Sequence, residues 1–159
     1  MILYHGSNVE VHKPRLLRFQ RPLDFGNGFY LTTDKVQAVR WAKRVQQRNR
    51  NGVACVNAYE VDEEALAKLR VLAFHAPDSA WLRFVVSNRR HVAVNEGWDV
   101  INGPVADDQT SAVIDLFLSG IYDEDEAVRR LLPQKLSDQW TFKTDGAIAI
   151  LHFVEAIKA

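Results

Sequence analysis

Residues 24–41, which read DFGNGFYLTTDKVQAVRW, combine a glycine-rich turn, a short aromatic strand and the start of a helix. Gly26 and Gly28 allow backbone angles that other residues avoid, so the chain can turn tightly there and a ligand can approach closely. The apolar run Phe29–Leu31 favours a strand. We therefore expect a turn, a strand and a helix in this order, with the rest of the fold arranged around them.

The helix expected after this strand has one apolar and one basic side. Thr33 or Asp34 is a suitable N-cap, and the helix extends to about Arg48. The apolar residues recur at helical spacing and predict that Trp41 points inward: Ala38, Trp41, Ala42 and Val45. The outer arc is typical of a solvated face, with nucleic-acid contact as the alternative: Lys35, Arg40, Lys43, Arg44 and Arg48.

Tyr30 and Trp41 stand at the two ends of this strand–helix unit. A strand that ends in Tyr30 and a helix with Trp41 on its buried face bring both rings to one cleft, where they can clamp a flat heterocycle. Packing against other core side chains is the alternative for both residues. The spacing alone leaves these two interpretations open.

The composition is that of an ordinary globular protein. The chain has 159 residues, of which 47% are hydrophobic and 25% are charged, and this length fits a single domain, residues 1–159. Lys and Arg number 20, as do Asp and Glu, so no net charge attracts nucleic acid or a membrane. The sequence indicates neither a leader peptide nor a membrane span, and we expect a cytoplasmic protein, with export by a specialised system left open.

Several other segments have strand or helix patterns. The single cysteine, Cys55, lies in a stretch typical of a buried strand. Residues 102–104 predict a turn, and Asp107 or Asp108 after it can cap a helix. Strands near both ends, with helices in irregular alternation between them, favour the α+β class. The expected strands are 53–61, 98–101, 139–142 and 152–157, and the expected helix starts lie near Asp62, Asp78 or Ser79, Gln109, Asp123 and Asp145.

The polar residues between these elements do not indicate a metal centre. His75 and His91 stand alone in polar settings, without the spacing of metal ligands. The proline-containing loop of residues 12–24 is basic, and contact with the phosphates of a dinucleotide and a solvated connection are both open. Its cationic residues are Lys13, Arg15, Arg18 and Arg21.

Three segments together resemble the signature segments of ADP-ribosyltransferases. The first is His5-Gly6-Ser7, the second is Gly28-Phe29-Tyr30 with Ala38 and Trp41 behind it, and the third is the late segment around Ser137-Asp138-Gln139. They are similar to the diphtheria-toxin and poly-ADP-ribose polymerase branch, whose triad is His, Tyr and Glu. More narrowly, the chain resembles a bacterial domain family of unknown function near that superfamily, with DFG-x-GFY, GP-x-ADD and SDQ blocks.

The resemblance implies a split two-sheet fold around a cleft for NAD, which serves as substrate. It implies a mono-ADP-ribosyltransferase, toxin-like in character, that modifies an unknown protein or nucleic-acid acceptor and releases nicotinamide. By resemblance, His5 binds the adenosine ribose, Gly6 offers main-chain groups to the nicotinamide amide with help from Ser7, and Tyr30 stacks on the nicotinamide. The full set of NAD-binding residues so implied is His5, Gly6, Ser7, Gly28, Phe29, Tyr30, Ala38 and Trp41.

The chain departs from the resemblance at Gln139, which stands where the family has its catalytic glutamate. A glutamine amide can hold a ribose hydroxyl, but it carries no negative charge and cannot act as a base. Three functions stay open: a transferase with the triad His5, Tyr30 and Gln139, a non-catalytic module that binds NAD or ADP-ribose, and a nuclease or other hydrolase that uses His5 with Asp107 or Asp108.

Overall fold

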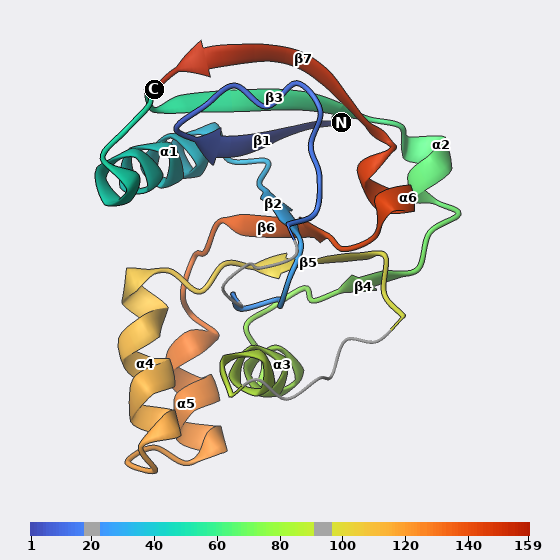
Figure 1. The fold of residues 1–159 in the computed structure, drawn as a ribbon. Helices are drawn as coiled ribbons and strands as arrows, with labels where there is room; N and C mark the ends of the chain where they lie inside the picture. Colours follow the sequence, from blue (N-terminus) through green and yellow to red (C-terminus); the bar gives the residue numbers. More distant parts are fainter. Residues whose placement is uncertain (18–22, 91–96) are drawn as a thin grey trace.

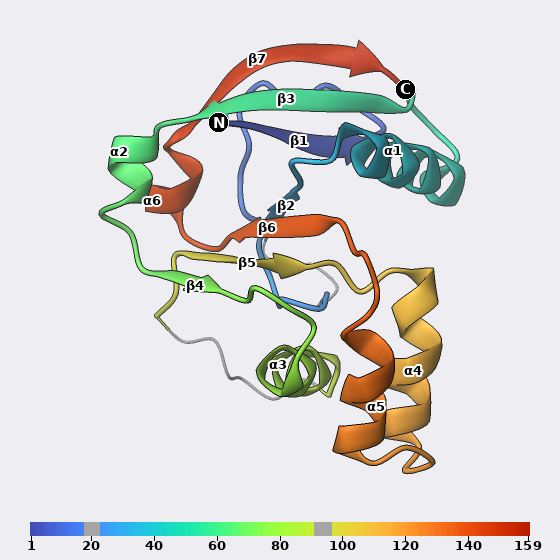
Figure 2. The same ribbon diagram turned by 180° about the vertical axis from the view of Figure 1, so that it is seen from behind.

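The computed structural model describes residues 1–17, 23–90 and 97–159 and arranges them in two β-sheets and six helices (Figure 1). The α+β class expected from the sequence is confirmed. The two sheets lie one above the other, and α3, α4 and α5 lie beyond the second sheet (Figures 1 and 2). Arg18, Arg21 and His91, which the sequence singled out, fall outside the described residues.

The first sheet has three antiparallel strands in the order β1-β3-β7. They are β1 (Ile2–Ser7), β3 (Cys55–Val61) and β7 (Leu151–Lys158). Cys55 is buried on β3, as the sequence predicts. Helix α1 (Lys35–Asn49) packs against β1 and β3 and covers part of this sheet (Figure 1).

The second sheet has four strands in the order β2-β6-β5-β4. They are β2 (Phe29–Leu31), β6 (Asp138–Phe142), β5 (Val100–Pro104) and β4 (Val71–Ala73). β4 and β5 are parallel, and the other two pairs are antiparallel. The three-residue β4 is missed by the sequence analysis because so short a run has no measurable periodicity.

The turn predicted at residues 102–104 is wrong, because these residues extend β5. Asn102 lies opposite Trp140, and Pro104 lies opposite Asp138 on β6. Pro104 is the last residue of the strand, where a missing backbone N–H disturbs the ladder least. Strand pairing therefore overrides the local turn preference of Asn-Gly-Pro.

A backbone bridge between Tyr4 and Thr32 joins the two sheets. Tyr4 on β1 donates its backbone N–H to the Thr32 carbonyl at 2.8 Å, and Thr32 returns the bond to the Tyr4 carbonyl at 3.0 Å. This junction brings the first motif segment, at the end of β1, beside the second, on β2.

The apolar residues form two clusters, one on each face of the second sheet. Phe29 and Leu31 belong to the cluster between the two sheets, which also contains Leu3 and Tyr59. Tyr30 points to the other face and belongs to the cluster covered by α3 (Ser79–Arg89), α4 (Asp108–Leu118) and α5 (Glu124–Leu131). Alternation along β2 thus sends neighbouring aromatic side chains into different cores.

Aspartate side chains cap most of the helices. The aspartate directly before each of α1, α3, α4, α5 and the short α2 (Glu63–Leu66) accepts hydrogen bonds from backbone N–H groups in the first turn of that helix. The helix expected near Asp145 is α6 (Asp145–Ile148), and an aspartate cap there would be wrong, because Thr144 precedes the helix with an extended backbone and its hydroxyl accepts from Ala147 N. No helix in the described ranges has both the length and the apolarity that crossing a bilayer requires. The predicted capping residues that the structure confirms are Asp34, Asp78 and Asp107, and Asp62 and Asp123 cap the helices whose starts were expected near them.

Candidate functional site

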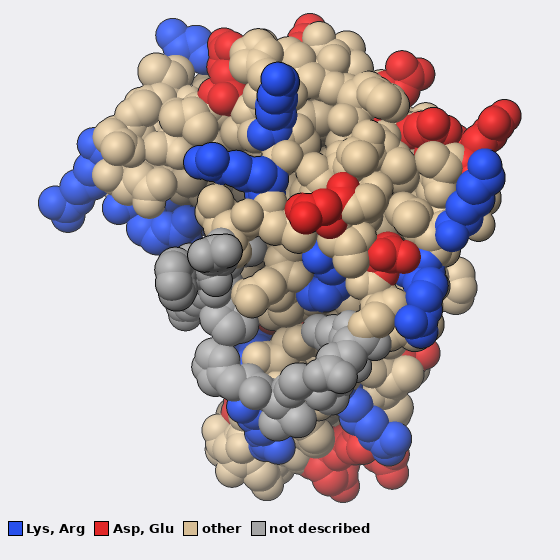
Figure 3. Space-filling model, turned by 45° about the vertical axis from the view of Figure 1, so that its right-hand side comes forward, with Lys and Arg blue, Asp and Glu red and all other residues tan. Residues whose placement is uncertain are grey.

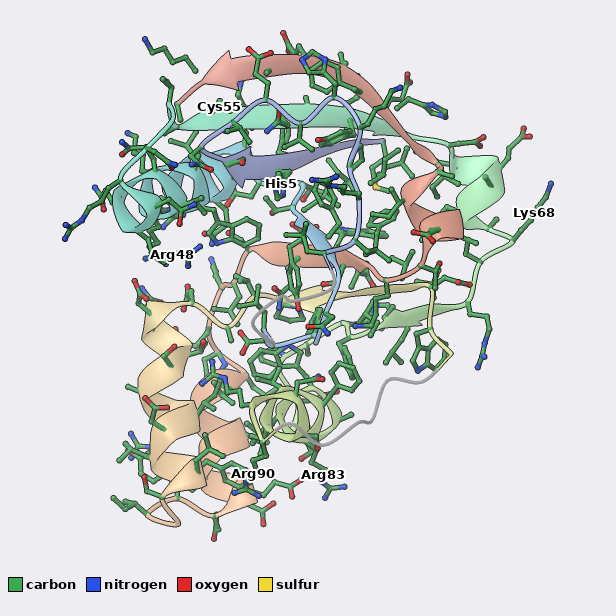
Figure 4. The ribbon with its side chains drawn as sticks, viewed as in Figure 1. His5, Arg48, Cys55, Lys68, Arg83 and Arg90 are labelled. Atoms are coloured by element: carbon green, nitrogen blue, oxygen red, sulfur yellow. The ribbon has the colours of Figure 1, made fainter. Side chains whose placement is uncertain are left out.

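His5 is held at the junction of the two sheets. Its Nδ1 lies 2.7 Å from the Tyr30 carbonyl oxygen, and its ring stacks on Phe29 with centroids 4.2 Å apart. Figure 4 places His5 under β1, on the side of the second sheet. A carbonyl only accepts, so Nδ1 carries the proton in the neutral ring and Nε2 is left as an acceptor.

Burial keeps this imidazole neutral at physiological pH. The pKa of His5 lies below its ordinary value because the ring is shielded from water, and the bond to the Tyr30 carbonyl opposes this shift only in part. A neutral ring with a free Nε2 can accept a hydrogen bond from a hydroxyl group. This arrangement suits binding and orientation rather than proton abstraction, since a lowered pKa makes a weaker base.

Gly6 allows β1 to touch helix α1. A methyl group on Gly6 would overlap the Ala38 carbonyl, and it would lie 2.6 Å from Ala42 N and 3.0 Å from Trp41 Cβ. Only glycine fits such an approach between two backbones. Ser7, which is also buried, accepts a bond from the backbone N–H of Val9 through its hydroxyl, at 3.3 Å.

Trp41 is less buried than the helical spacing predicts. It is half-buried, and among the described residues it belongs to neither core cluster nor to the side chains packed against them. Ala38 and Ala42 fill the buried face of α1, as expected. The large indole therefore lies at the edge of that face, beside Gly6, where part of it meets solvent.

Tyr30 packs as a core residue, which is the alternative that the sequence left open. Its hydroxyl donates to the Gly26 carbonyl at 2.5 Å and accepts from Phe25 N at 3.1 Å, and the residue is 8% exposed. Burial raises the pKa of Tyr30 well above its ordinary range. The rings of Tyr30 and Trp41 therefore do not form a ready-made clamp.

The glycine turn before Tyr30 is fixed at both ends. Gly26 has a φ of +76°, which strongly favours glycine, and a methyl group on Gly28 would overlap Thr141 on β6. Lys143 donates from Nζ to the carbonyls of Phe25 and Asn27 at 2.8 and 2.6 Å. Burial lowers the pKa of Lys143 to about 8.

Ser137 and Asp138 join the third motif segment to the second. Asp138 Oδ1 accepts from the hydroxyls of Thr32 and Thr33 at 2.9 Å each and from Thr33 N at 3.0 Å, while Oδ2 accepts from Trp140 Nε1. The Ser137 hydroxyl donates to Asp34 at 2.6 Å, and this bond lowers the pKa of the Asp34 carboxyl. The start of β6 is thereby bonded to the end of β2 and the cap of α1.

Gln139 follows these two residues and is buried, with 3% of its surface exposed. Its Nε2 has no hydrogen-bond partner in the described chain. The register of β2 and β6 places Thr141 opposite Tyr30, so Gln139 is the diagonal neighbour of Tyr30 on the same face of the sheet. An unpaired buried polar group is costly, by about 1–3 kcal/mol. Asn102 Oδ1 and Thr141 Oγ1, on the adjoining part of the same sheet, are also buried without a partner in the described chain.

Asp107 and Asp108 lie beside α1, at the start of α4. Asp107 Oδ1 caps α4 through Gln109 N and Thr110 N, and the exposed Asp108 pairs with Arg44 at 2.6 Å. The capping role expected for this pair is confirmed for Asp107. Both residues line a cavity of about 190 Å³ between α1 and α4, together with Gln37, Arg40, Arg44 and Gln109.

Residues 1–153 match the family described as protein of unknown function (DUF3990). The chain belongs to this family. No curated protein and no solved structure matches it. The family match covers all three motif segments, from His5 to Gln139, and its description assigns no activity to them.

In this family member, the other polar residues considered from the sequence stand apart from the junction. Lys13, Arg15 and His75 are exposed. In the described part of the chain, no group of three or more His, Cys, Asp or Glu side chains is placed to hold a metal ion. A second cavity, of about 470 Å³, lies between Met1, α2 and Val71, and none of the predicted site residues lines it.

The residues that hold the site together link β2, α1 and β6: Thr32, Ser137, Asp138 and Lys143. The sequence analysis named Ser137 and Asp138 only as part of the third motif segment, and it missed Thr32 and Lys143, which have no pattern that distinguishes them from ordinary surface residues. One signal was available: TTD and SDQ both pair hydroxyl side chains with an acid, and such groups bond each other readily when a fold brings them together.

Proposed function

We propose that this protein binds NAD at the junction of β1, β2, α1 and β6 and acts as a slow mono-ADP-ribosyltransferase. In this reaction the bond between the nicotinamide nitrogen and ribose C1′ breaks, and its electron pair leaves with nicotinamide. C1′ then bonds to a nucleophile on the acceptor, whose proton is released to solvent. The proposal needs a site that orients NAD and stabilises a forming cation.

The observation that carries the proposal is the unpaired amide of Gln139 at the meeting point of the three motif segments. His5, Tyr30 and Gln139 are far apart in sequence, yet a hydrogen bond joins the first two and a strand register joins the last two. A buried donor without a partner is the expected state of a group whose partner is a ligand. A ribose hydroxyl would satisfy it.

The surrounding residues suit the parts of NAD in different ways. His5 Nε2 accepts from a ribose hydroxyl, and Gly6 places no side chain between β1 and α1. Trp41 supplies the partly exposed ring that can stack on nicotinamide, and Tyr30 acts as a positioning residue, because its carbonyl fixes His5 and its ring lies beside Gln139. This assignment reverses the stacking roles that the sequence analysis gave to the two rings.

Slow turnover follows from the neutral side chain at Gln139. A carboxylate near C1′ would stabilise the forming cation, and such electrostatic terms are usually the largest in catalysis. Asp107 is engaged as a helix cap and Asp108 is paired with Arg44, so neither is a free charge. Removal of either aspartate is therefore expected to leave the rate unchanged.

A non-catalytic module for NAD or ADP-ribose is the second candidate, and the same neutral Gln139 favours it. Binding needs only hydrogen bonds and stacking, which this residue set supplies. The hydrolase with His5 and an aspartate has less support, because no hydrogen bond or ion pair between described residues joins His5 to Asp107 or Asp108, and His5 is a weakened base.

Nicotinamide release from NAD separates these candidates. The wild type, Gln139→Glu, Asp107→Asn and Asp108→Asn are measured under one condition. We expect slow release from the wild type and both Asp→Asn variants, and faster release from Gln139→Glu. Loss of release in one Asp→Asn variant would instead assign the charge to that aspartate.

NAD binding is measured on the same proteins by calorimetry. Saturable binding with no release in any variant would establish the binding module. The absence of binding to the folded wild type would remove both candidates. Trp41→Ala and His5→Ala are the better probes of the contacts, since Tyr30→Ala would also open a cavity in the core.

A further inference from the structure

Helix α1 presents a surface of one charge sign. Between Lys35 and Asn49 it carries five cationic residues and no acidic one, and all five are exposed. Among the ion pairs of the described residues, only the one between Arg44 and Asp108 involves this helix. The left edge of the space-filling view, at the height of α1, likewise shows blue side chains and no red ones (Figure 3).

Three of these cations form a regular row. Arg40, Arg44 and Arg48 follow one another at every fourth residue, which places them on one side of the helix at intervals of about 6 Å along its axis. Successive phosphates of an extended nucleic-acid strand have a similar spacing. Arg48 lies on the side of α1 that faces the start of α4 (Figure 4), so this row runs along the cavity between the two helices.

A buried amide opens into that cavity. Gln37 is 5% exposed and lines the cavity, and no hydrogen bond from its side chain to the described residues is present. Gln109 lines the opposite wall. The cavity of about 190 Å³ has room for one nucleobase, whose edge offers both donors and acceptors to amide side chains.

Trp41 adds an aromatic ring on the same helix. It follows Arg40 directly and lies one turn from both Gln37 and Arg44, and it packs in neither core cluster of the described chain. Part of this half-buried ring meets solvent, and an aromatic ring next to arginines is a common arrangement for stacking the bases of single strands.

We propose that this face of α1, with the cavity between α1 and α4, binds single-stranded nucleic acid. This inference rests on the proposed function, because it names nucleic acid as the class of acceptor for the proposed transferase. Arg40 and Arg48 contact phosphates, and Arg44 can do so once its ion pair with Asp108 is broken. Gln37 hydrogen-bonds to the edge of a base.

An anionic membrane fits this face less well. Helices that bind at membrane surfaces insert an apolar face, whereas the apolar face of α1 is packed on β1 and β3. Val36, at the start of α1, is its only large hydrophobic residue that is exposed in the described structure. A single-stranded nucleic acid needs no such insertion.

The test is fluorescence anisotropy with labelled single-stranded DNA and RNA oligonucleotides of about 12 nucleotides, without NAD, over a range of salt concentrations. The variant Arg40→Gln/Arg48→Gln is compared with Lys68→Gln/Arg90→Gln, which removes the same net charge far from α1 (Figure 4). We expect the first variant to bind roughly tenfold more weakly at low salt and to lower the salt slope by about 1.4. The second should match the wild type.

Three results would overturn the proposal. The wild type could fail to bind either oligonucleotide, both variants could weaken binding equally, or anionic vesicles could bind the wild type while oligonucleotides do not. NAD binding by calorimetry is measured separately on the same wild-type protein. A protein that binds NAD without nucleic acid would thus refute this inference and leave the proposed function standing.

Discussion

Replacement of Gln139 by methionine should make the protein more stable and less able to bind NAD. The amide Nε2 is buried without a partner in the described chain, and 3% of the residue is exposed. Desolvation of such a group costs about 1–3 kcal/mol, which an apolar side chain of the same length recovers. A volume-conserving exchange costs less than about 1.5 kcal/mol in packing, so we expect a net gain of about 1 kcal/mol.

Urea and thermal unfolding measure this gain. For a chain of this size, 1 kcal/mol corresponds to a rise in Tm of about 2–4 °C. Calorimetry on the same variant should show NAD binding weakened roughly tenfold, because one hydrogen bond to the ligand is lost. The free energy of unfolding then rises while the affinity for NAD falls, as is expected where a functional residue lowers the stability of the folded protein.

Thr110→Val is the matched control for this experiment. Thr110 is fully buried, like Gln139, but its hydroxyl donates to the Asp107 carbonyl at 3.0 Å. Removal of a paired group should destabilise the protein by about 1 kcal/mol. If Gln139→Met is destabilised as much as Thr110→Val, or if it binds NAD like the wild type, the assignment of the amide to a ligand is refuted.

Three further predictions concern the residues around Gln139. The pKa of His5 is lowered in the folded protein, so as the pH drops below the unfolded value of about 6.5 the unfolded chain takes up the proton first and the free energy of unfolding falls. The difference in unfolding free energy between the wild type and His5→Asn, measured by urea unfolding, should therefore shrink between about pH 7.5 and pH 5. A constant difference over this range would contradict this prediction. Gly6→Ala should cost about 1–3 kcal/mol, since its methyl group meets backbone atoms of α1, and an unchanged urea midpoint would show that α1 can move away. Asp138→Ala should cost about 3 kcal/mol and Asp138→Asn less, because the amide retains an acceptor for the two threonines; equal losses would mean that the charge, rather than these bonds, matters.

Elements with a strong local signal were predictable from the sequence. The helix after residue 34 has both a cap and an apolar face, and the glycine turn before Tyr30 has two positions that require glycine, so the strand–helix unit agrees with the structure. A cap at Asp107 or Asp108 was expected because an acid directly before a helix has one common role, and the structure assigns it to Asp107. The short strand β4 and the extension of β5 over residues 102–104 depend on pairing with distant strands, which local patterns do not record.

The candidate site was predictable in its members but not in their geometry. The sequence predicts that the side chains of Phe29 and Tyr30 point to opposite faces of the strand. It does not predict which of these two faces lies beside the site. Trp41 has the spacing of a core residue, but β1 approaches α1 at Gly6 and leaves the indole at the edge. The unpaired state of Gln139 follows from the pairing of β6 with its neighbours and has no local sequence signal.

The bonds of Asp138 also determine when the site can exist during synthesis. Thr32 and Asp34 are made early, and their partners Asp138 and Ser137 come more than 100 residues later. A growing chain therefore has its glycine turn, α1 and His5 long before it has the strand that bonds them in place, and contacts of such long range form late in folding. A ribosome-bound chain that ends before β6 should lack the assembled site and be unable to bind NAD, so any activity that uses this site would begin only after β6 has been made.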